Sequence, residues 1–287
     1  MSEQEFEARR PSLLGLAYRM LGSRADAEDA VQDAWLRWRE KADGVDNPRA
    51  WLTTVVTRLC LDRLKSAQRQ REVYVGPWLP EPVADAGAFT PEAASELADD
   101  LSFALLLALE RLTPLERAAF LLHDVFDASW AEVSDALGRS EAACRRLASR
   151  ARRAVRERRR TPAPPERHAR LLGGFLAAVE QGDVAGLTRL LTEDVVALTD
   201  GGGRKAAALN PIRGPDRVAR FFVSLARKYR TAGIVLQAEQ VTLNGVPAFL
   251  LYADGKLDQA VTLEVRGPHI AAIYVVRNPD KLSRLMH

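Results

Sequence analysis

Cysteine is almost absent from this sequence of 287 residues, which contains only Cys60 and Cys144. Each cysteine lies inside an apolar helical pattern, without a CxxC motif or a histidine at metal-ligand spacing. This excludes a disulfide scaffold and a zinc site. We expect both thiols to be buried packing residues, and we expect no metal and no cofactor.

Long apolar runs are also missing. No stretch reaches the ~18 residues that a membrane-spanning helix needs. The first twenty residues carry early charges such as Glu3 and Arg9, in place of the apolar core of a secretory signal. We therefore expect a soluble, cytoplasmic protein without a membrane partner, and the length favours two domains or three small ones.

Positive and negative charges are separated along the chain, although the formal net charge is only +3. Residues 138–160 contain ten arginines against two glutamates, and residues 72–100 contain seven acidic residues and no lysine or arginine. A dense arginine block is typical of an element that binds a polyanion such as nucleic acid. A solvated helix tail without a ligand is the alternative interpretation on charge alone.

Residues 1–72 have the apolar spacing of three helices. Gly22 ends the first helix, and Ser23 followed by Asp26 predicts a capped start for the second. Asn47-Pro48 predicts the start of a long third helix, with asparagine as N-cap and proline at the first helical position. Basic residues become denser toward the end of this third helix.

A second helical region is predicted at residues 96–160, after a linker at 73–95 whose prolines exclude a regular helix. Two capping boxes, at residues 113–116 and 129–132, predict helix starts within the region. A short helix, a glycine-containing turn at 138–140 and a further helix form a helix-turn-helix pattern.

The last helix of this pattern has one packing side and one basic side. Cys144, Leu147, Ala148, Ala151 and Val155 recur at helical spacing and form the packing side. The outward side carries Arg145, Arg146, Ser149, Arg150, Arg152 and Arg153. Arginine makes bidentate bonds to guanine in the major groove of B-DNA and neutralises phosphates, so we predict that this helix reads duplex DNA.

After a proline-rich hinge at 161–165 the periodicity becomes mostly strand-like. Asn244-Gly245 and Asp254-Gly255 predict two hairpins. Helices followed by antiparallel strands indicate an α+β domain at 166–287. The predicted fold class is therefore multidomain, with two all-α domains, the second containing the helix-turn-helix, and a C-terminal α+β domain.

Several motifs, in the right order, resemble the bacterial sigma factors of the extracytoplasmic-function (ECF) type. Residues 26–34 (DAEDAVQDA), 47–52 (NPRAWL) and 61–64 (LDRL) resemble the second sigma domain, and residues 112–117 (LTPLER) and 129–153 resemble the fourth. The resemblance covers roughly residues 6–160. It implies a factor that binds RNA polymerase core and directs promoter-specific transcription initiation.

The resemblance also implies roles for individual residues. The helix at 26–39 is expected to dock on the β′ clamp helices of the polymerase, through Asp26, Asp29, Asp33 and Trp38, and the β flap is expected as a further contact. Residues 41–71 are expected to open and read the −10 element, which suits the tryptophan and basic residues there, through Arg49, Trp51, Arg58, Arg63 and Lys65. The helix around Arg145 is expected to read the −35 element.

Three further segments resemble the SigJ-like subgroup, whose C-terminal extension has a SnoaL-like, NTF2-type cone fold. They are Trp78-Leu79-Pro80, Asp200-Gly201-Gly202-Gly203-Arg204 and Asn278-Pro279-Asp280-Lys281-Leu282. The resemblance implies that the fused domain regulates the sigma domains in place of a separate anti-sigma protein. Trp78 and Leu79 are apolar between prolines and the glycines permit close backbone approach, so we predict that the three segments pack together.

Two other classes of function stay open on the sequence. One is a one-component helix-turn-helix regulator with a small-molecule sensor domain, which would need no core polymerase. The other is a DNA-binding module fused to an active SnoaL-like enzyme, with Asp200, Asp258 and Glu264 as acid–base candidates. We expect no catalysis, because neither a Ser/His/Asp set nor a metal-ligand set is discernible. A small-molecule ligand in the C-terminal domain stays open.

Overall fold

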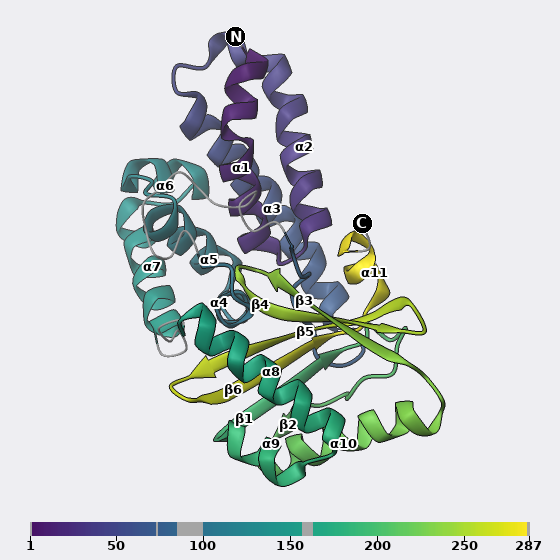
Figure 1. Ribbon diagram of the computed structural model, residues 1–287. Coiled ribbons are helices and arrows are strands. Elements are labelled where there is room, and N and C mark those ends of the chain that lie inside the picture. The colour runs from purple at the N-terminus through teal and green to yellow at the C-terminus, as the bar shows by residue number, and fades with distance from the viewer. Residues whose placement is uncertain (1, 73, 85–99, 157–162, 286–287) are drawn as a thin grey trace. The chain divides into compact units, whose positions relative to one another are not determined.

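The computed structural model describes residues 2–72, 74–84, 100–156 and 163–285, and it divides into two compact units (Figure 1). The first unit holds Met1–Glu72 and Asp85–Arg159, and the second holds Val73–Ala84 and Arg160–His287. Most of the predicted linker up to Ala84 therefore folds with the C-terminal domain. The predictions for residues 85–99 and 157–162 lie outside the described residues.

The first helical domain is a three-helix bundle of α1 (Ser2–Leu21), α2 (Arg24–Lys41) and α3 (Pro48–Glu72), with a short helix η1 (Ala42–Gly44) before α3. Its predicted helix starts are confirmed: Ser23 accepts the N–H of Asp26, and Asn47 Oδ1 accepts the N–H of Ala50 at 3.1 Å. The buried side chains include Tyr18, Met20, Trp38, Leu52 and Cys60. Cys60 is a packing residue, as predicted, and burial raises the pKa of its thiol to about 12.

The second helical domain contains α4 (Phe103–Glu110), α5 (Pro114–Phe120), η3 (Leu121–Val125), α6 (Trp130–Leu137) and α7 (Glu141–Arg156). Both predicted capping boxes form, at Thr113 with Glu116 and at Ser129 with Glu132. Such caps satisfy helix N–H groups that have no partner within the helix. The two boxes therefore fix where α5 and α6 begin.

The C-terminal domain is α+β, as predicted. Its helices are α8 (Pro165–Gln181), α9 (Val184–Leu190), α10 (Pro215–Thr231) and α11 (Pro279–Leu282), followed by η4 (Ser283–Leu285). Its strands are β1 (Leu191–Asp200), β2 (Ile212–Arg213), β3 (Leu236–Leu243), β4 (Val246–Ala253), β5 (Lys256–Arg266) and β6 (His269–Val276), in the sheet order β2-β1-β6-β5-β4-β3. The two predicted hairpins join β3 to β4 and β4 to β5.

One strand pair corrects the prediction of an antiparallel sheet, because β1 pairs with β6 in parallel. Parallel neighbours need a long crossover connection, and the whole of β2, α10 and β3–β5 lies between β1 and β6. Periodicity along the chain gives no information about such a distant pairing.

Helices α8, α9 and α10 cover one face of this sheet (Figure 1). Apolar side chains fill the space between, among them Leu172, Phe175, Leu187, Phe222, Val261, Leu263 and Ile273. Phe175 and Phe222 meet edge to face with ring centroids 5.1 Å apart. Full burial of such a side chain contributes roughly 2–3 kcal/mol, so this face is a packed core. Within the described ranges, no helix is long and apolar enough to cross a membrane.

Candidate nucleic-acid interface and linker clamp

Helices α6 and α7 form the predicted helix-turn-helix. Gly138 ends α6 in the left-handed conformation, at φ 60°, and Ser140 Oγ accepts the N–H of Ala143 at the start of α7. Cys144, Ala148, Ala151 and Val155 are buried, as predicted for the packing side, and Leu147 is half-buried. This packing fixes the orientation of α7, so its basic side faces away from the core of the domain.

The arginines of α7 fall into two groups. Arg146 and Arg153 are exposed, and so is Ser149 between them. Three others make contacts within the domain: Arg145 pairs with Glu141 at 2.7 Å, Arg150 with Glu116 at 2.8 Å and Arg152 with Asp124 at 2.6 Å. Arg145 and Arg152 also approach the ring of Trp130, at 5.0 and 5.9 Å.

The basic residues predicted to face the −10 element are already engaged within the first unit. Arg49 donates to the carbonyl of Phe126 at 3.0 Å, and Arg58 donates to the carbonyls of Asp135 at 2.7 Å and Ala136 at 3.2 Å. These acceptors lie in the second helical domain. Carbonyls at the C-terminal end of a helix such as α6 attract cations, which explains the contact of Arg58.

Two further basic residues of α3 are held by neighbouring carboxylates. Arg63 pairs with Asp33 at 2.7 Å, and Lys65 pairs with Asp62 at 2.9 Å. Of the five residues expected at the −10 element, the structure therefore brings Arg49 and Arg58 against the helix-turn-helix domain, and it leaves Arg63 and Lys65 paired on their own domain.

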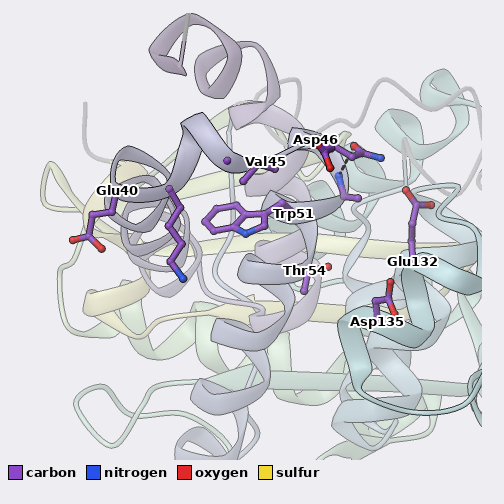
Figure 2. Close-up of a pocket in the computed structure, with 11 residues that line it drawn as sticks. Glu40, Val45, Asp46, Trp51, Thr54, Glu132 and Asp135 are labelled. Carbon is purple, nitrogen blue, oxygen red and sulfur yellow. Dashed lines mark hydrogen bonds between the residues drawn. The ribbon is translucent and has the colours of Figure 1, made fainter.

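The fifth of these residues, Trp51, lines a cavity of about 670 Å³ (Figure 2). The wall of the cavity comes from the end of α2, the loop before α3, the first turns of α3, and α6. Its charged residues are mainly acidic, namely Glu40, Asp46, Glu132 and Asp135, and Lys41 also lines it. Trp51 is half-buried and offers an aromatic side chain to this cavity.

The outer face of α2 is acidic. Asp26 and Asp29 are exposed, Asp33 is half-exposed beside Arg63, and Leu36 on the same face is 48% exposed. Leu36 is a candidate contact residue absent from the sequence prediction, although it follows Asp29 and Asp33 at helical spacing.

Trp38 requires a correction. We predicted that it contacts the polymerase, but its side chain is only 1% exposed and packs on Trp51 with ring centroids 5.6 Å apart. It follows Ala30 and Ala34 at intervals of four residues, and all three belong to the buried stripe of α2. Trp38 is therefore a core residue that supports Trp51.

A buried cation joins the two helical domains. Arg117, on α5, is 3% exposed, donates to the carbonyl of Met20 at the end of α1, and pairs with Glu110 at 2.8 Å. Burial lowers the pKa of this guanidinium to about 10. A buried charge is tolerated only when it is paired and hydrogen-bonded, so Arg117 depends on both acceptors.

In the second unit, three segments distant in sequence meet at the carboxylate of Asp200, which is fully buried. It accepts hydrogen bonds from the hydroxyl of Tyr74 at 2.6 Å, the N–H of Leu79 at 2.9 Å and the N–H of Gly202 at 3.0 Å. The ammonium of Lys281 also pairs with it at 2.6 Å. We call this site the linker clamp: Tyr74, Trp78, Leu79, Asp200, Gly202, Asn278 and Lys281.

Lys281 provides the positive charge of the linker clamp. Its Nζ lies 4.3 Å from the centre of the Trp78 ring and 5.1 Å from that of Tyr74, and it also donates to the carbonyl of Leu79. A cation over aromatic faces contributes up to about 2 kcal/mol when it is desolvated. Burial is the main cause that raises the pKa of Tyr74 well above its usual value, and the hydrogen bond to Asp200 is the second. The Tyr74 hydroxyl therefore stays protonated and remains a hydrogen-bond donor.

The glycines of the turn after Asp200 permit the close approach that the sequence analysis predicted. A Cβ on Gly202, which has φ 59°, would lie 2.3 Å from Asn278 Nδ2, and one on Gly203 would lie 3.3 Å from Val75. Asn278 donates from the same nitrogen to the hydroxyl of Tyr74 at 3.0 Å. The structure therefore brings together all three segments that we had expected to pack, and it adds Tyr74, which the sequence analysis missed.

Beyond these contacts, the other members of the three motifs also have defined positions. Pro80 is buried beside Leu79, Arg204 pairs with Asp280 at 3.3 Å, and Leu282 is buried. Pro279 begins α11, whose N-cap is Asn278, and Gly201 lies against the carbonyl of Lys205. Further along the linker, Val83 exchanges two hydrogen bonds with Asn244.

The three acid–base candidates are all held by hydrogen-bond donors. Asp258 is 5% exposed and accepts from Lys205 at 3.1 Å, Tyr229 at 2.9 Å and Arg277 at 2.8 Å. Burial alone would raise the pKa of Asp258, but the charge of Arg277 and the three hydrogen bonds lower it. Glu264 accepts from the Tyr274 hydroxyl at 2.8 Å, and Asp200 belongs to the linker clamp. Among the described residues, no cluster of His, Cys, Asp or Glu could hold a metal ion.

Comparison with protein families explains the two helical domains. Residues 6–70 match the model for Sigma-70 region 2, and residues 102–155 match the model for Sigma-70, region 4. The two regions occur in the order of a transcription initiation factor of the sigma-70 class.

Relatives that align along nearly the whole chain define the family more narrowly. The chain is 43% identical to the ECF RNA polymerase sigma factor SigJ of Mycobacterium tuberculosis over 297 residues, which cover 99% of this chain and 94% of the relative. It is 33% identical to the probable ECF sigma factor SigI of the same organism, covering 98% and 94%. The crystal structure of the M. tuberculosis SigJ protein superposes with a TM-score of 0.77, at 38% identity and 98% coverage of both chains.

The chain belongs to the ECF RNA polymerase sigma factors and resembles SigJ along its whole length. Its regions 2 and 4 imply binding to RNA polymerase core and to promoter DNA. A one-component regulator that acts through its helix-turn-helix alone is therefore excluded as the explanation of this chain.

Proposed function

We propose that the C-terminal domain of this sigma factor controls promoter use by holding the linker between the two DNA-reading domains. The observation that carries the proposal is the buried carboxylate of Asp200, which takes hydrogen bonds from Tyr74 and Leu79 on the linker and an ion pair from Lys281. A charged group buried without these partners would be strongly unfavourable. The buried carboxylate of Asp200 is therefore stable only while the linker is bound to the C-terminal domain.

Pinning the linker limits how far the two domains can separate. The eleven residues from 74 to 84 would span roughly 36–40 Å if they were free and fully extended. A sigma factor has to reach the −10 and −35 elements at the same time. Attachment of this segment to the C-terminal domain therefore changes the reach that the two DNA-reading domains share.

For the −35 element, the proposal assigns base reading to the exposed side of α7. Arg146, Ser149 and Arg153 are exposed there, the two arginines form no ion pair among the described residues, and arginine is suited to guanine edges in the major groove. Arg145, Arg150 and Arg152, which have internal partners, are assigned to phosphates and to the orientation of the helix.

For the −10 element, the proposal assigns the cavity beside Trp51 to an unstacked base of the opened strand. Aromatic side chains stack on separated bases without requiring a particular sequence. The carboxylates of Glu132 and Asp135 on its wall repel a phosphodiester chain, and Arg49 and Arg58 are engaged with the helix-turn-helix domain. We infer that the two helical domains separate before this surface meets DNA.

For the polymerase, the proposal assigns the outer face of α2, with Asp26, Asp29, Asp33 and Leu36, to the β′ clamp helices. An acidic face with one exposed leucine suits an interface with electrostatic complementarity. The helix-turn-helix domain is assigned to the β flap. Core polymerase and promoter DNA both belong to the cytoplasm, so the proposal places the protein there.

The C-terminal domain is proposed to be regulatory and not catalytic. Both oxygens of Asp200 and of Asp258 accept hydrogen bonds from the linker or the domain, one oxygen of Glu264 accepts from Tyr274, and the sheet face under the helices is filled by apolar side chains. A general acid or base must be within reach of a substrate proton. These three carboxylates are better suited to holding the domain and the linker together.

The experiment compares the full-length Lys281→Met protein with a Lys256→Met control, since Lys256 is an exposed lysine of β5 outside the linker clamp. We expect Lys281→Met to expose residues 74–84 to limited proteolysis and to change the affinity of the reconstituted holoenzyme for promoter fragments. The control should do neither. Unchanged cleavage and unchanged promoter affinity in Lys281→Met would refute the proposal.

A further inference from the structure

Helix α10 carries a stripe of exposed basic residues that the functions above do not use. Arg217, Arg220, Arg227 and Lys228 are all exposed, and so is Ser224 between them. At 100° per residue these five positions fall within about a third of the helix circumference. We call them the α10 stripe.

The α10 stripe is held in place by the opposite side of its helix. Val218, Ala219, Phe222 and Val223 are buried against the core of the C-terminal domain. The charged side therefore has a fixed direction toward solvent, on a rigid element rather than on a loop. Substitutions on the stripe leave the packing side unchanged.

Most of the charge on the α10 stripe is not neutralised within the domain. The described residues show one ion pair, between Arg220 and Asp216 at 3.6 Å, with both side chains 72% exposed. Exposed pairs of this kind are weak and are screened by salt. Asp216 is also the one acidic residue in the sequence of α10. The stripe thus presents a positive surface without matching negative charge on its own helix.

We propose that the α10 stripe binds the phosphate backbone of the duplex DNA that this sigma factor occupies. From Arg217 to Lys228 the helix rises about 16 Å, and that length of B-DNA carries roughly ten phosphates. Arginine, lysine and serine side chains are frequent phosphate contacts, which position a protein on DNA without reading its sequence. The stripe is thus a third DNA contact, outside the two sigma regions.

Two observations favour DNA over an acidic protein as the partner. The exposed large apolar residues of the described chain are Leu36, Val75, Leu209, Val235 and Leu236, and none lies on α10. Protein interfaces need an apolar or aromatic centre, which the stripe lacks. In addition, the sigma regions of the same chain bring duplex DNA to the C-terminal domain at high effective concentration. The proposal rests on this DNA binding but not on the linker clamp.

The test measures binding of the full-length protein to a random-sequence 40-base-pair duplex by fluorescence anisotropy, over a range of salt concentrations. The stripe variant is Arg217→Gln/Arg227→Gln/Lys228→Gln, and the control variant is Arg167→Gln/Arg170→Gln/Lys256→Gln, which removes the same charge from exposed positions off the stripe. A third variant, Arg146→Gln/Arg150→Gln/Arg153→Gln, reports on α7.

Each phosphate contact contributes about 0.9 to the slope of log affinity against log salt, so the stripe variant should lose roughly 2–3 from that slope. The α7 variant should lose a comparable amount, and the control variant should lose much less. An unchanged slope in the stripe variant, or an equal loss in the control, overturns the proposal. Weaker binding to core polymerase with unchanged DNA binding also overturns it, in favour of a protein partner. An unaffected α7 variant would instead contradict the role assigned to α7.

Discussion

The buried carboxylate of Asp200 allows the stability of the linker clamp to be predicted. Asp200→Asn keeps the size of the side chain but removes its negative charge. The amide oxygen can still accept the N–H of Leu79 in the place of Oδ2, but the amide nitrogen then takes the place of Oδ1 and faces the hydroxyl of Tyr74 and the N–H of Gly202. The ammonium of Lys281 loses the negative charge of Asp200, with which it pairs at 2.6 Å.

Removal of one partner from a buried ion pair costs about 3–5 kcal/mol. We take the lower end, about 3 kcal/mol, because one hydrogen bond survives and Lys281 keeps its contacts with Trp78 and Tyr74. Each 1.4 kcal/mol corresponds to a factor of ten, so local opening of the linker should become about 100-fold more frequent.

Amide hydrogen exchange, followed by mass spectrometry on peptides from residues 74–84, measures this opening, because exchange of protected amides reports local unfolding. Asp216→Asn is the matched control: Asp216 is exposed and makes one weak ion pair with Arg220. The control should leave exchange in the linker unchanged. Exchange that is equally slow in Asp200→Asn and in wild type would refute the reasoning, since the linker would then be held by something other than this carboxylate.

Three further predictions concern the helical domains. Arg117→Met removes the buried cation that bonds Met20 and Glu110, so the first unit should lose about 3 kcal/mol of stability. Calorimetry should show a lower unfolding temperature for Arg117→Met but not for Arg139→Met, which changes an exposed residue. An unchanged unfolding temperature in Arg117→Met would contradict the role of Arg117. Arg146→Gln should weaken binding to a −35 fragment by about 1–3 kcal/mol if the side chain contacts a base, with core binding unchanged. If the wild-type protein binds the −35 fragment and a scrambled fragment with equal affinity, α7 does not read bases. Asp29→Lys should reduce co-purification with core polymerase, because it reverses charge on the exposed face of α2. The control Asp62→Lys on α3 should not reduce it. If Asp29→Lys retains the polymerase fully, α2 is not part of the interface.

Local features of the fold were predictable from sequence because their causes lie within a few residues. The capping residues Ser23, Asn47, Thr113 and Ser129 begin helices where predicted, since each satisfies N–H groups at most three residues away. The hairpin turns at 244–245 and 254–255 follow from residues that tolerate positive φ. The helix-turn-helix and its packing side could be predicted for the same reason.

Long-range pairings could not be obtained in this way. Trp38 has the spacing of the buried stripe of α2, and the family resemblance suggested a contact that its burial against Trp51 excludes. Arg58 bonds carbonyls 77 and 78 residues away, and β1 pairs in parallel with β6 across the intervening strands. Tyr74 was missed because a lone tyrosine in a linker gives no signal until Asp200 is known to lie beside it.

The central claim is that the linker clamp controls promoter use, and run-off transcription by the reconstituted holoenzyme tests it most directly. Wild type and Trp78→Ala are compared on the same genomic fragments with the same core polymerase, with core assembly measured in parallel. Coupling between two sites is typically 1–3 kcal/mol, so we expect promoter-specific transcript from Trp78→Ala to change by about fivefold or more while core binding stays the same. Equal transcript from the two proteins, with residues 74–84 shown to be released in the variant, would contradict the account.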